Sequence, residues 1–283
     1  MIKANPTILK FYLLMMDSFS DYISHKYTIK SIGNPDHYKT IIIKKIVRTF
    51  HTLNKLTKRT QDEVSCRCVL RSILDNITTY CFIYERDDVD EIMFRHYLYE
   101  IDGYNCYKNN VVNGIMEKGN NEYPFEQLCD EAIRQLNEQL VCHPFSKLEN
   151  EVVNTIINNV NWKFESLQNP QSVKFQDMYI YIGFNKQLAD YYQGYLSQFV
   201  HGLSFSNLQC VTPQQIGNIV YESIPMADRL IQAMYKTFPK DEKKFYVFCS
   251  RIIKKLRKES EFNTDNLFSF AKSLIKKDKT III

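Results

Sequence analysis

Apolar residues recur every three or four positions along almost the whole chain, and this spacing constrains the fold more than any other feature. In residues 6–26, for example, Ile8, Tyr12 and Phe19 fall on one side of a helix. The β-branched run at 40–43 has strand propensity, but the helical spacing continues through it. Only eight Gly and eight Pro interrupt 283 residues, which favours long elements with short connections. We therefore predict an all-α, multi-helix bundle in which no strand is needed.

Start and stop signals divide this pattern into about eleven helices. Thr60, with Glu63 three residues later, forms a capping-box pattern, and Gly202 is a typical helix stop. Thr212 followed by Pro213 is an N-cap with Pro at the first helical position. The expected helices cover residues 6–26, 36–58, 61–85, 89–118, 124–141, 144–160, 172–184, 186–201, 213–238, 240–258 and 264–277.

The segment 161–172 contains Asn169-Pro170 and lacks the helical pattern, so we expect a connection there. The whole chain, residues 1–283, is expected to form a single helical domain. The alternative is a division near 161–172 into an N-terminal and a C-terminal bundle.

Positive charge is concentrated toward the C-terminus. The formal net charge is +4, whereas residues 240–283 carry twelve Lys/Arg against six Asp/Glu, a net of +6. This basic segment is a candidate surface for nucleic acid or an acidic protein, with Lys254, Lys255, Arg257 and Lys258 as contacts. The alternative is a solvated helix face. No stretch is long and apolar enough for a membrane span, so we expect no membrane partner.

The eight cysteines form no Cys-x-x-Cys pair, which excludes the usual zinc and thioredoxin spacings. Several lie in apolar stretches, where free thiols serve as small core residues. Such thiols suit a reducing compartment, and no signal peptide is visible, so we expect a cytoplasmic protein.

The first candidate site is Arg71 with Asp75. The two residues are four apart and therefore share a face of the third predicted helix. Leu70 and Leu74 flank them, so we expect partial burial, and a buried charge needs a partner. Two interpretations stay open: a polar pair ready for chemistry in a cleft, or an ion pair that holds the packing.

The second candidate site is Ser197 with His201, also four apart and near a helix end. Imidazole titrates near neutral pH and can act as a general base, but a nucleophilic serine also needs an orienting acid and an oxyanion site. Asp75 or Asp190 would supply the acid. Alternatively, His201 only stabilises the helix C-terminus, where a cationic imidazole is favourable.

The third candidate lies on the fourth predicted helix, where His96 and Glu100 have the spacing of a two-ligand metal site. Their neighbours Arg95, Asp102 and Tyr104 complete the group. A metal needs at least three ligands and no second pair of this kind is visible, so we expect neither a metal nor a cofactor. Gly-rich phosphate loops, the GxSxG elbow and the HExxH motif are also missing from the sequence.

Three motifs occur together in this chain. They are an Arg-x-x-x-acid helix (Arg71, Asp75), the later Trp162 and a Tyr-Leu-Ser-x-x-x-His helix (195–201). Together they resemble the uncharacterised helical bacterial family catalogued as domain of unknown function 5677, over about residues 60–205. The acid of that family is typically Glu, so the shorter carboxylate of Asp75 reaches less far toward the histidine.

The chain is also similar to small helical bundles of prokaryotic toxin and defence systems, many of which cut RNA. Their ribonuclease signature is an Arg, four to six intervening residues and then a His on one helix. None of the six histidines here has an Arg at that distance upstream.

Two hypotheses about function follow. The first is a binding or regulatory module, in a prokaryotic stress or phage-defence system, because no complete catalytic set is visible. The second is a ribonuclease-like protein or another hydrolase, whose Arg stabilises developing negative charge and whose His moves the proton. Its site residues would be Arg71, Asp75, Ser197 and His201.

Overall fold

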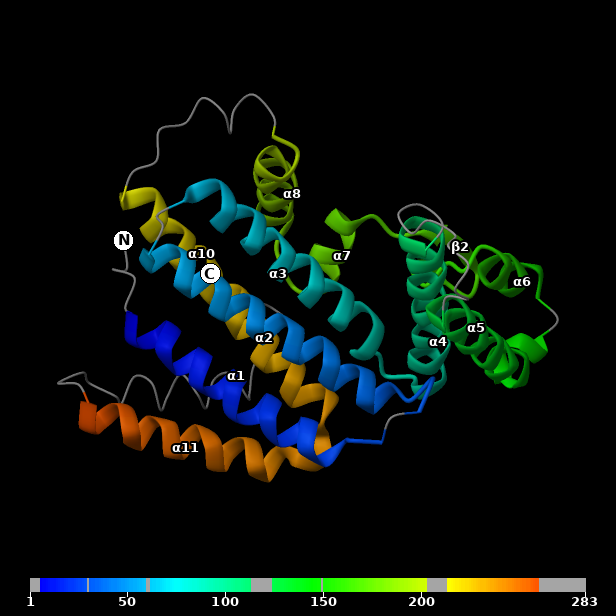
Figure 1. The fold of residues 1–283 in the computed structure, drawn as a ribbon, viewed down its shortest axis with the longest axis horizontal. Helices are drawn as coiled ribbons and strands as arrows, with labels where there is room; N and C mark the ends of the chain where they lie inside the picture. Colours follow the sequence, from blue (N-terminus) through cyan, green and yellow to red (C-terminus); the bar gives the residue numbers. More distant parts are fainter. Residues whose placement is uncertain are drawn as a thin grey trace. The chain divides into compact units, whose positions relative to one another are not determined.

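The computed structural model describes residues 6–29, 31–59, 62–112, 124–148, 150–202 and 213–259. Within these ranges it contains ten α-helices, a short π-helix, two short 3-10 helices and a two-stranded hairpin (Figure 1). The prediction of an all-α fold is confirmed. No helix in these ranges is both long enough and apolar enough to cross a membrane. The α-helices are α1 (Pro6–Lys26), α2 (Pro35–Arg59), α3 (Glu63–Tyr84), α4 (Val89–Tyr107), α5 (Pro124–Cys142), α6 (Glu151–Asn158), α7 (Phe175–Tyr181), α8 (Lys186–Val200), α10 (Pro213–Thr237) and α11 (Glu242–Glu259).

Helix boundaries follow the caps and stops that the local sequence provides. The carboxylate of Asp62 caps α3 by accepting a hydrogen bond from the Ser65 N–H at 3.2 Å. The predicted cap Thr60 lies outside the described residues, as do Thr212 and the helix expected over 264–277. The predicted stop at Gly202 is confirmed, because this residue has a φ of +59° directly after the last turn of α8.

Two expected helices differ from the observed ones. The segment expected as a single helix over 144–160 is a 3-10 helix, η2 (Pro144–Leu148), followed by α6. The side chain of Asn150 starts α6 by accepting from the Val152 N–H at 2.8 Å, which separates the two pieces. The helix expected over 89–118 is α4 and then the π-helix η1 (Lys108–Val112); its remainder lies outside the described residues.

The segment 161–172 contains a hairpin where only a connection was expected. Strands β1 (Phe164–Ser166) and β2 (Asn169–Ser172) pair in antiparallel fashion. Asn161 holds the hairpin closed: its Nδ2 donates to the Pro170 carbonyl at 2.6 Å, and its Oδ1 accepts from Ser172 Oγ at 2.8 Å. These strands have no alternating apolar pattern, so the sequence carried no strand signal to read.

The chain groups into two compact units. Unit 1 comprises Met1–Thr28, Lys39–Glu85 and Phe175–Ile283, and unit 2 comprises Ile29–Tyr38 and Arg86–Lys174. The expected single domain and its alternative, a division near 161–172, both stay predictions; the 161–172 segment itself lies inside unit 2.

The core of unit 1 forms around α1, α3 and α10, and α1 also packs against α11 (Figure 1). It is rich in aromatic side chains, as the composition of the chain suggests. Phe19 of α1 contacts Phe238 and Phe245 with ring centroids 6.3 and 5.3 Å apart. Further fully buried members are Phe11, Tyr12, Phe50, Tyr80 and Tyr192.

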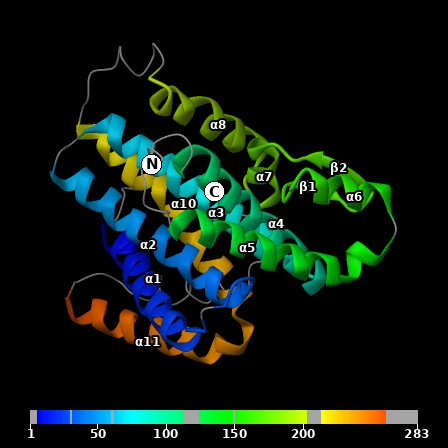
Figure 2. The same cartoon turned by 45° about the vertical axis from the view of Figure 1, so that its right-hand side comes forward.

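Unit 2 is built on the packing of α4 against α5, with the hairpin beside α6 (Figure 2). Arg95 of α4 is fully buried, and its guanidinium lies 3.6 Å from the centre of the Phe164 ring. It also donates to Glu91 at 2.8 Å and to the Trp162 carbonyl at 2.9 Å. Arg95 therefore fixes the hairpin to α4, which is a structural role.

Candidate functional site

Three of the four predicted site residues meet in unit 1, where α3 packs against α8. Arg71 Nε donates to both carboxylate oxygens of Asp75, at 3.0 and 2.9 Å. Its Nη1 lies 3.3 Å from Ser197 Oγ. Arg71, Asp75 and Ser197 thus form one hydrogen-bonded cluster, which we call the α3–α8 cluster.

Most donors of the Arg71 guanidinium already have acceptors within the chain. Nη1 donates to the Tyr192 carbonyl at 3.2 Å, and Nη2 donates to Gln193 Oε1 at 2.8 Å. A guanidinium has five N–H groups, and the Arg71 side chain is only 12% exposed. This geometry suits an ion pair that holds two helices together better than a group that awaits a substrate.

Asp75 is occupied in the same way. Its Oδ1 accepts a hydrogen bond from the Tyr179 hydroxyl of α7 at 2.6 Å. Burial raises the pKa of Tyr179 above its usual range, and the charge of Asp75 raises it further, so the phenol remains a donor. The Ser197 hydroxyl donates to the Gln193 carbonyl one turn back, which directs its proton to the backbone.

His201 lies apart from this arrangement. It is the exposed C-cap of α8, and its backbone N–H donates to the Ser197 carbonyl at 3.1 Å. Among the described residues, its side chain forms no hydrogen bond or ion pair with Arg71, Asp75 or Ser197. The structure therefore brings together three of the four predicted residues.

A second arginine of α3, Arg67, was not predicted as a site residue. Its Nε donates to Glu63 at 2.9 Å and its Nη1 to Glu222 of α10 at 2.9 Å. The Arg67 and Glu63 side chains are 3% and 1% exposed. Burial raises the pKa of Glu222, although Arg67 acts in the opposite direction. The pair Glu63–Arg67 is visible as an i,i+4 spacing, but Glu222 is 155 residues away from Arg67 in sequence.

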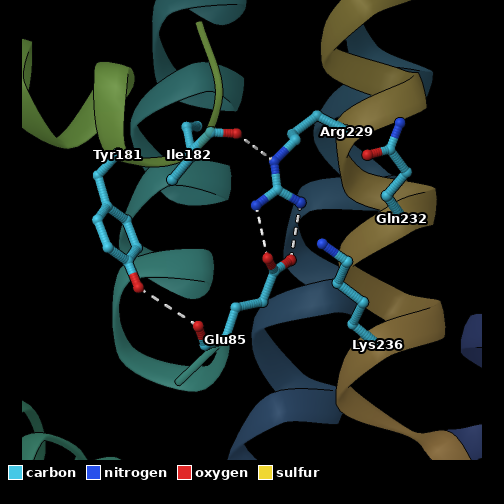
Figure 3. Close-up of a pocket in the computed structure, with 6 residues that line it drawn as sticks. All are labelled: Glu85, Tyr181, Ile182, Arg229, Gln232 and Lys236. Carbon is cyan, nitrogen blue, oxygen red and sulfur yellow. Dashed lines mark hydrogen bonds and ion pairs between the residues drawn. The ribbon is translucent and has the colours of Figure 1, made fainter. Parts of the chain in front are cut away.

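A third buried arginine, Arg229 of α10, forms a two-pronged ion pair with Glu85 at 2.7 Å for both bonds (Figure 3). Its Nε donates to the Ile182 carbonyl at 2.6 Å, and the Tyr181 hydroxyl lies 3.4 Å from the Glu85 carbonyl oxygen. The cavity beside this pair encloses about 20 Å³. That space suits a water molecule and not an organic ligand, so the pair has a structural role.

A much larger hollow lies in unit 2, between α4 and α5. It encloses about 700 Å³. We call it the α4–α5 groove and define it by its lining residues from the two helices and the segment before α2. These are Tyr99, Glu100, Asp102, Gly103, Tyr104 and Tyr107 of α4, Leu128, Cys129 and Ala132 of α5, and Ile32 and Tyr38.

The floor of the α4–α5 groove is backbone. A Cβ atom built on Gly103 would meet no heavy atom within 4 Å, so the helix surface is open there. Tyr99 and Tyr107 lie one turn before and one turn after Gly103 on the same face of α4. The small side chain of Ala132 faces the groove from α5. Aromatic side chains around two small residues give a hollow with apolar walls.

Polar groups converge at one side of the groove. The hydroxyls of Tyr38 and Tyr104 lie 3.0 Å apart. Burial raises the pKa of Tyr38 above its usual range, and Tyr104 and Glu100 raise it further, so its phenol stays protonated. The exposed carboxylate of Asp102 accepts a hydrogen bond from Trp162 Nε1 at 3.1 Å.

His96 and Glu100 form a buried pair behind this wall. Their Nε2 and Oε1 atoms are 2.6 Å apart, and both side chains are 0% exposed. The i,i+4 spacing therefore places them together, as the sequence suggested. Among the described residues, no three His, Cys, Asp or Glu side chains are grouped so as to hold a metal ion.

The basic C-terminal segment is described as far as residue 259. In α11 the side chains of Lys254 and Lys255 are exposed, on the face opposite Ile252, Ile253 and Leu256. A partner for this segment stays a prediction.

The chain matches no family model, and comparison with curated proteins and with solved structures finds no significant similarity. The family resemblance therefore rests on its motif residues alone.

Proposed function

We propose that this chain is a binding module and that the α4–α5 groove is its ligand site. The observation that carries the proposal is the size and lining of the groove, which encloses about 700 Å³. Binding sites for small organic molecules typically have volumes of about 300–1,000 Å³, apolar walls and a few convergent polar groups. The chemistry offered by the groove is recognition, because its accessible polar groups are tyrosine hydroxyls and the Asp102 carboxylate, without a paired nucleophile and base.

The lining also narrows the kind of ligand. The described lining residues include the exposed Asp102 but no Lys or Arg, which disfavours an anion. Four tyrosine rings offer stacking and cation–π contacts. We therefore propose a ligand with a flat, apolar body that is neutral or positively charged.

A fragment screen tests this proposal. Neutral and cationic aromatic fragments are added to the full chain, and binding is detected by saturation-transfer NMR. Gly103→Trp fills the floor of the groove, and Gly103→Ala adds one methyl group into the same open space as a matched control. We expect a shared set of competing fragments to bind the unmodified chain and Gly103→Ala but not Gly103→Trp.

Circular dichroism and thermal melting establish that Gly103→Trp is folded. The proposal fails if no fragment binds the unmodified chain, or if a folded Gly103→Trp binds the same fragments with the same affinity.

The alternative proposal is a ribonuclease-like protein or another hydrolase. One observation favours it: Arg71, Asp75 and Ser197 form one hydrogen-bonded cluster. Its test is turnover of RNA by the purified chain, with loss of activity in Arg71→Ala and in His201→Ala. Turnover that survives both substitutions, or no turnover at all, rules this site out.

A cytoplasmic location is part of our proposal, as is a role in a prokaryotic stress or phage-defence system. The thiols support the location, since every cysteine in the described part of the chain is free. The motif resemblance to a bacterial family supports the setting.

A further inference from the structure

An uninterrupted run of positive charge lies on α2, outside every site described above. Between positions 39 and 59 the sequence has seven Lys or Arg and no Asp or Glu. Lys39 is buried and lies against the Tyr84 and Phe238 rings. The other six lie on the outer side of the helix, and we call them the α2 basic stripe. They are Lys44, Lys45, Arg48, Lys55, Lys58 and Arg59.

The stripe is linear because its spacing follows the helix. Lys45, Arg48, Lys55 and Arg59 are separated by three, seven and four residues, so they share one face. At 1.5 Å per residue, the stripe extends over about 23 Å. This length equals about seven steps of a duplex, whose phosphates recur every 3.4 Å or so along each strand.

Few acidic groups of the chain neutralise this stripe. From α1, Asp21 reaches Lys44 at 4.0 Å, and Asp17 is paired with His51 at 2.7 Å. The other five cations form no ion pair with any acid in the described part of the chain. The positive electrostatic potential of these five cations therefore extends into solvent, where it attracts a polyanion.

The surface beside three of these cations is hollowed. Lys44, Lys45 and Arg48 line a shallow hollow of about 450 Å³ together with Ile41, Thr49 and Thr52. The threonine hydroxyls donate to the Lys45 and Arg48 carbonyls, so the positive side chains supply the attraction.

The composition of the stripe distinguishes between polyanions. The apolar side of α2 is buried in the core of unit 1, and Ile41 alone is too little exposed apolar surface to insert into a membrane. The stripe has no aromatic side chain on which unpaired bases would stack, which disfavours a single strand. Binding to a duplex backbone requires neither an apolar face nor aromatic side chains, because positive side chains bind its phosphates electrostatically.

We propose that the α2 basic stripe binds the phosphate backbone of a nucleic-acid duplex without sequence preference. This inference is independent of the α4–α5 groove.

We test this proposal by fluorescence anisotropy. Labelled 16-base-pair RNA and DNA duplexes are titrated with the full chain at 50 to 200 mM salt. Each neutralised phosphate contributes a slope of roughly −0.9 to the plot of log affinity against log salt, so six cations set a limit of about −5. We expect a slope between about −3 and −5 for at least one of the two duplexes.

The triple variant Lys45→Gln, Arg48→Gln, Lys55→Gln removes three exposed cations. The triple variant Lys243→Gln, Lys254→Gln, Lys255→Gln removes the same charge from exposed positions of α11 and is the matched control. We expect the α2 variant to reduce the slope by about 2.7 and the affinity at 50 mM salt by more than tenfold. The α11 variant should keep at least half of the affinity.

Several outcomes would overturn the proposal. Equal loss in both variants would indicate a net-charge effect, and loss in the α11 variant alone would assign binding to the C-terminal segment. Binding to phosphatidylserine vesicles without binding to either duplex would identify a membrane surface instead.

Discussion

At the residue scale, buried arginines join the helices of unit 1. Arg71 connects α3 with α8, Arg67 connects α3 with α10, and Arg229 connects α10 with the end of α3. A planar guanidinium satisfies several acceptors at once, so one side chain fixes both the distance and the rotation of two helices. Of these three, only Arg71 was a candidate site residue in the sequence, and all three guanidinium groups form hydrogen bonds between helices.

Arg71→Ala separates the packing role from a catalytic one. The substitution removes the donors to Asp75, Gln193 and Ser197, so we expect the free energy of unfolding to fall by about 2 kcal/mol. His201→Ala removes an exposed cap and should change it by less than about 0.5 kcal/mol. Urea unfolding followed by circular dichroism measures both. A stable Arg71→Ala protein would contradict the packing role.

The Arg67 network predicts an asymmetry between its members. Arg67→Met leaves Glu63 buried without a counter-charge, so we expect a loss of about 3–5 kcal/mol. Glu222→Gln leaves the Glu63–Arg67 pair intact and should cost about 1 kcal/mol or less. Thermal melting of both variants measures the difference, and equal losses would show that Glu222 is the main partner of Arg67.

Glu222 also has a pH signature. The pKa of Glu222 is raised in the folded state. The contribution of Glu222 to the free energy of unfolding is therefore fully present below its unfolded pKa of about 4.3. This contribution is lost as the pH rises through the pKa of the folded state. At neutral pH, the partly buried negative charge of Glu222 destabilises the folded state, and Glu222→Gln has no such charge. The stability cost of that substitution should therefore be smaller at pH 7 than at pH 4.

At the element scale, two glycines have opposite roles. Gly103 lies inside α4 with helical backbone and open space around its missing Cβ. Gly33 has a φ of +75°, and a Cβ there would collide with the side chain of Gln139. The first glycine leaves the groove open at a cost in helix stability, and the second is required by the turn before α2.

Alanine substitutions should therefore change stability in opposite directions. Gly103→Ala should stabilise the chain by up to about 1 kcal/mol, because Ala is the better helix former and nothing obstructs it. Gly33→Ala should destabilise it by about 1 kcal/mol or more, because of the left-handed backbone and the contact with Gln139. Melting temperatures of the two variants check the signs; a destabilised Gly103→Ala would mean that the groove floor is already filled.

At the scale of the whole molecule, Asp241 joins segments that are far apart in sequence. It is 2% exposed and lies in the 3-10 helix η3 (Pro239–Asp241). It accepts hydrogen bonds from Tyr22 at 2.8 Å, Tyr27 at 2.7 Å and Lys26 at 2.5 Å. Burial opposes its charge, but these donors outweigh burial and hold the pKa of Asp241 below its usual range. One carboxylate thus fastens the end of α1 to the start of α11.

This carboxylate predicts how the stability of unit 1 depends on pH. The pKa of Asp241 in the folded state is below its unfolded value of about 3.9. The stability that Asp241 contributes is therefore fully present above about pH 3.9 and is lost as the pH falls through the pKa of the folded state. Asp241→Asn should lower the free energy of unfolding by roughly 1–3 kcal/mol at pH 7. The stability difference between the two proteins should shrink as the pH falls below about 3.9, and a difference that stays constant through the acid range would contradict the assignment.

The amino-acid sequence by itself determined the helical elements. Apolar spacing, caps such as Asn150 and stops such as Gly202 act within a few residues, so they can be read without knowing the fold. Pairs with i,i+4 spacing, including Arg71–Asp75 and His96–Glu100, are local for the same reason. The hairpin at 164–172 left no such signal, because Asn161 and turn contacts form it without an apolar pattern.

Only the tertiary structure decided what these elements do together. Besides Asp75, the partners of Arg71 lie more than 100 residues away on α8, so the pair that the sequence places on one helix also connects two helices. The α4–α5 groove is lined jointly by residues of two helices, with Gly103 on α4, Ala132 on α5 and aromatic side chains around them. The apolar periodicity indicates which side of a helix faces the core. It does not indicate which other helix that side contacts, or where the packed helices leave a hollow. Helix partners and hollows depend on how side chains that are distant in sequence fit together. A hollow therefore cannot be read from any single residue.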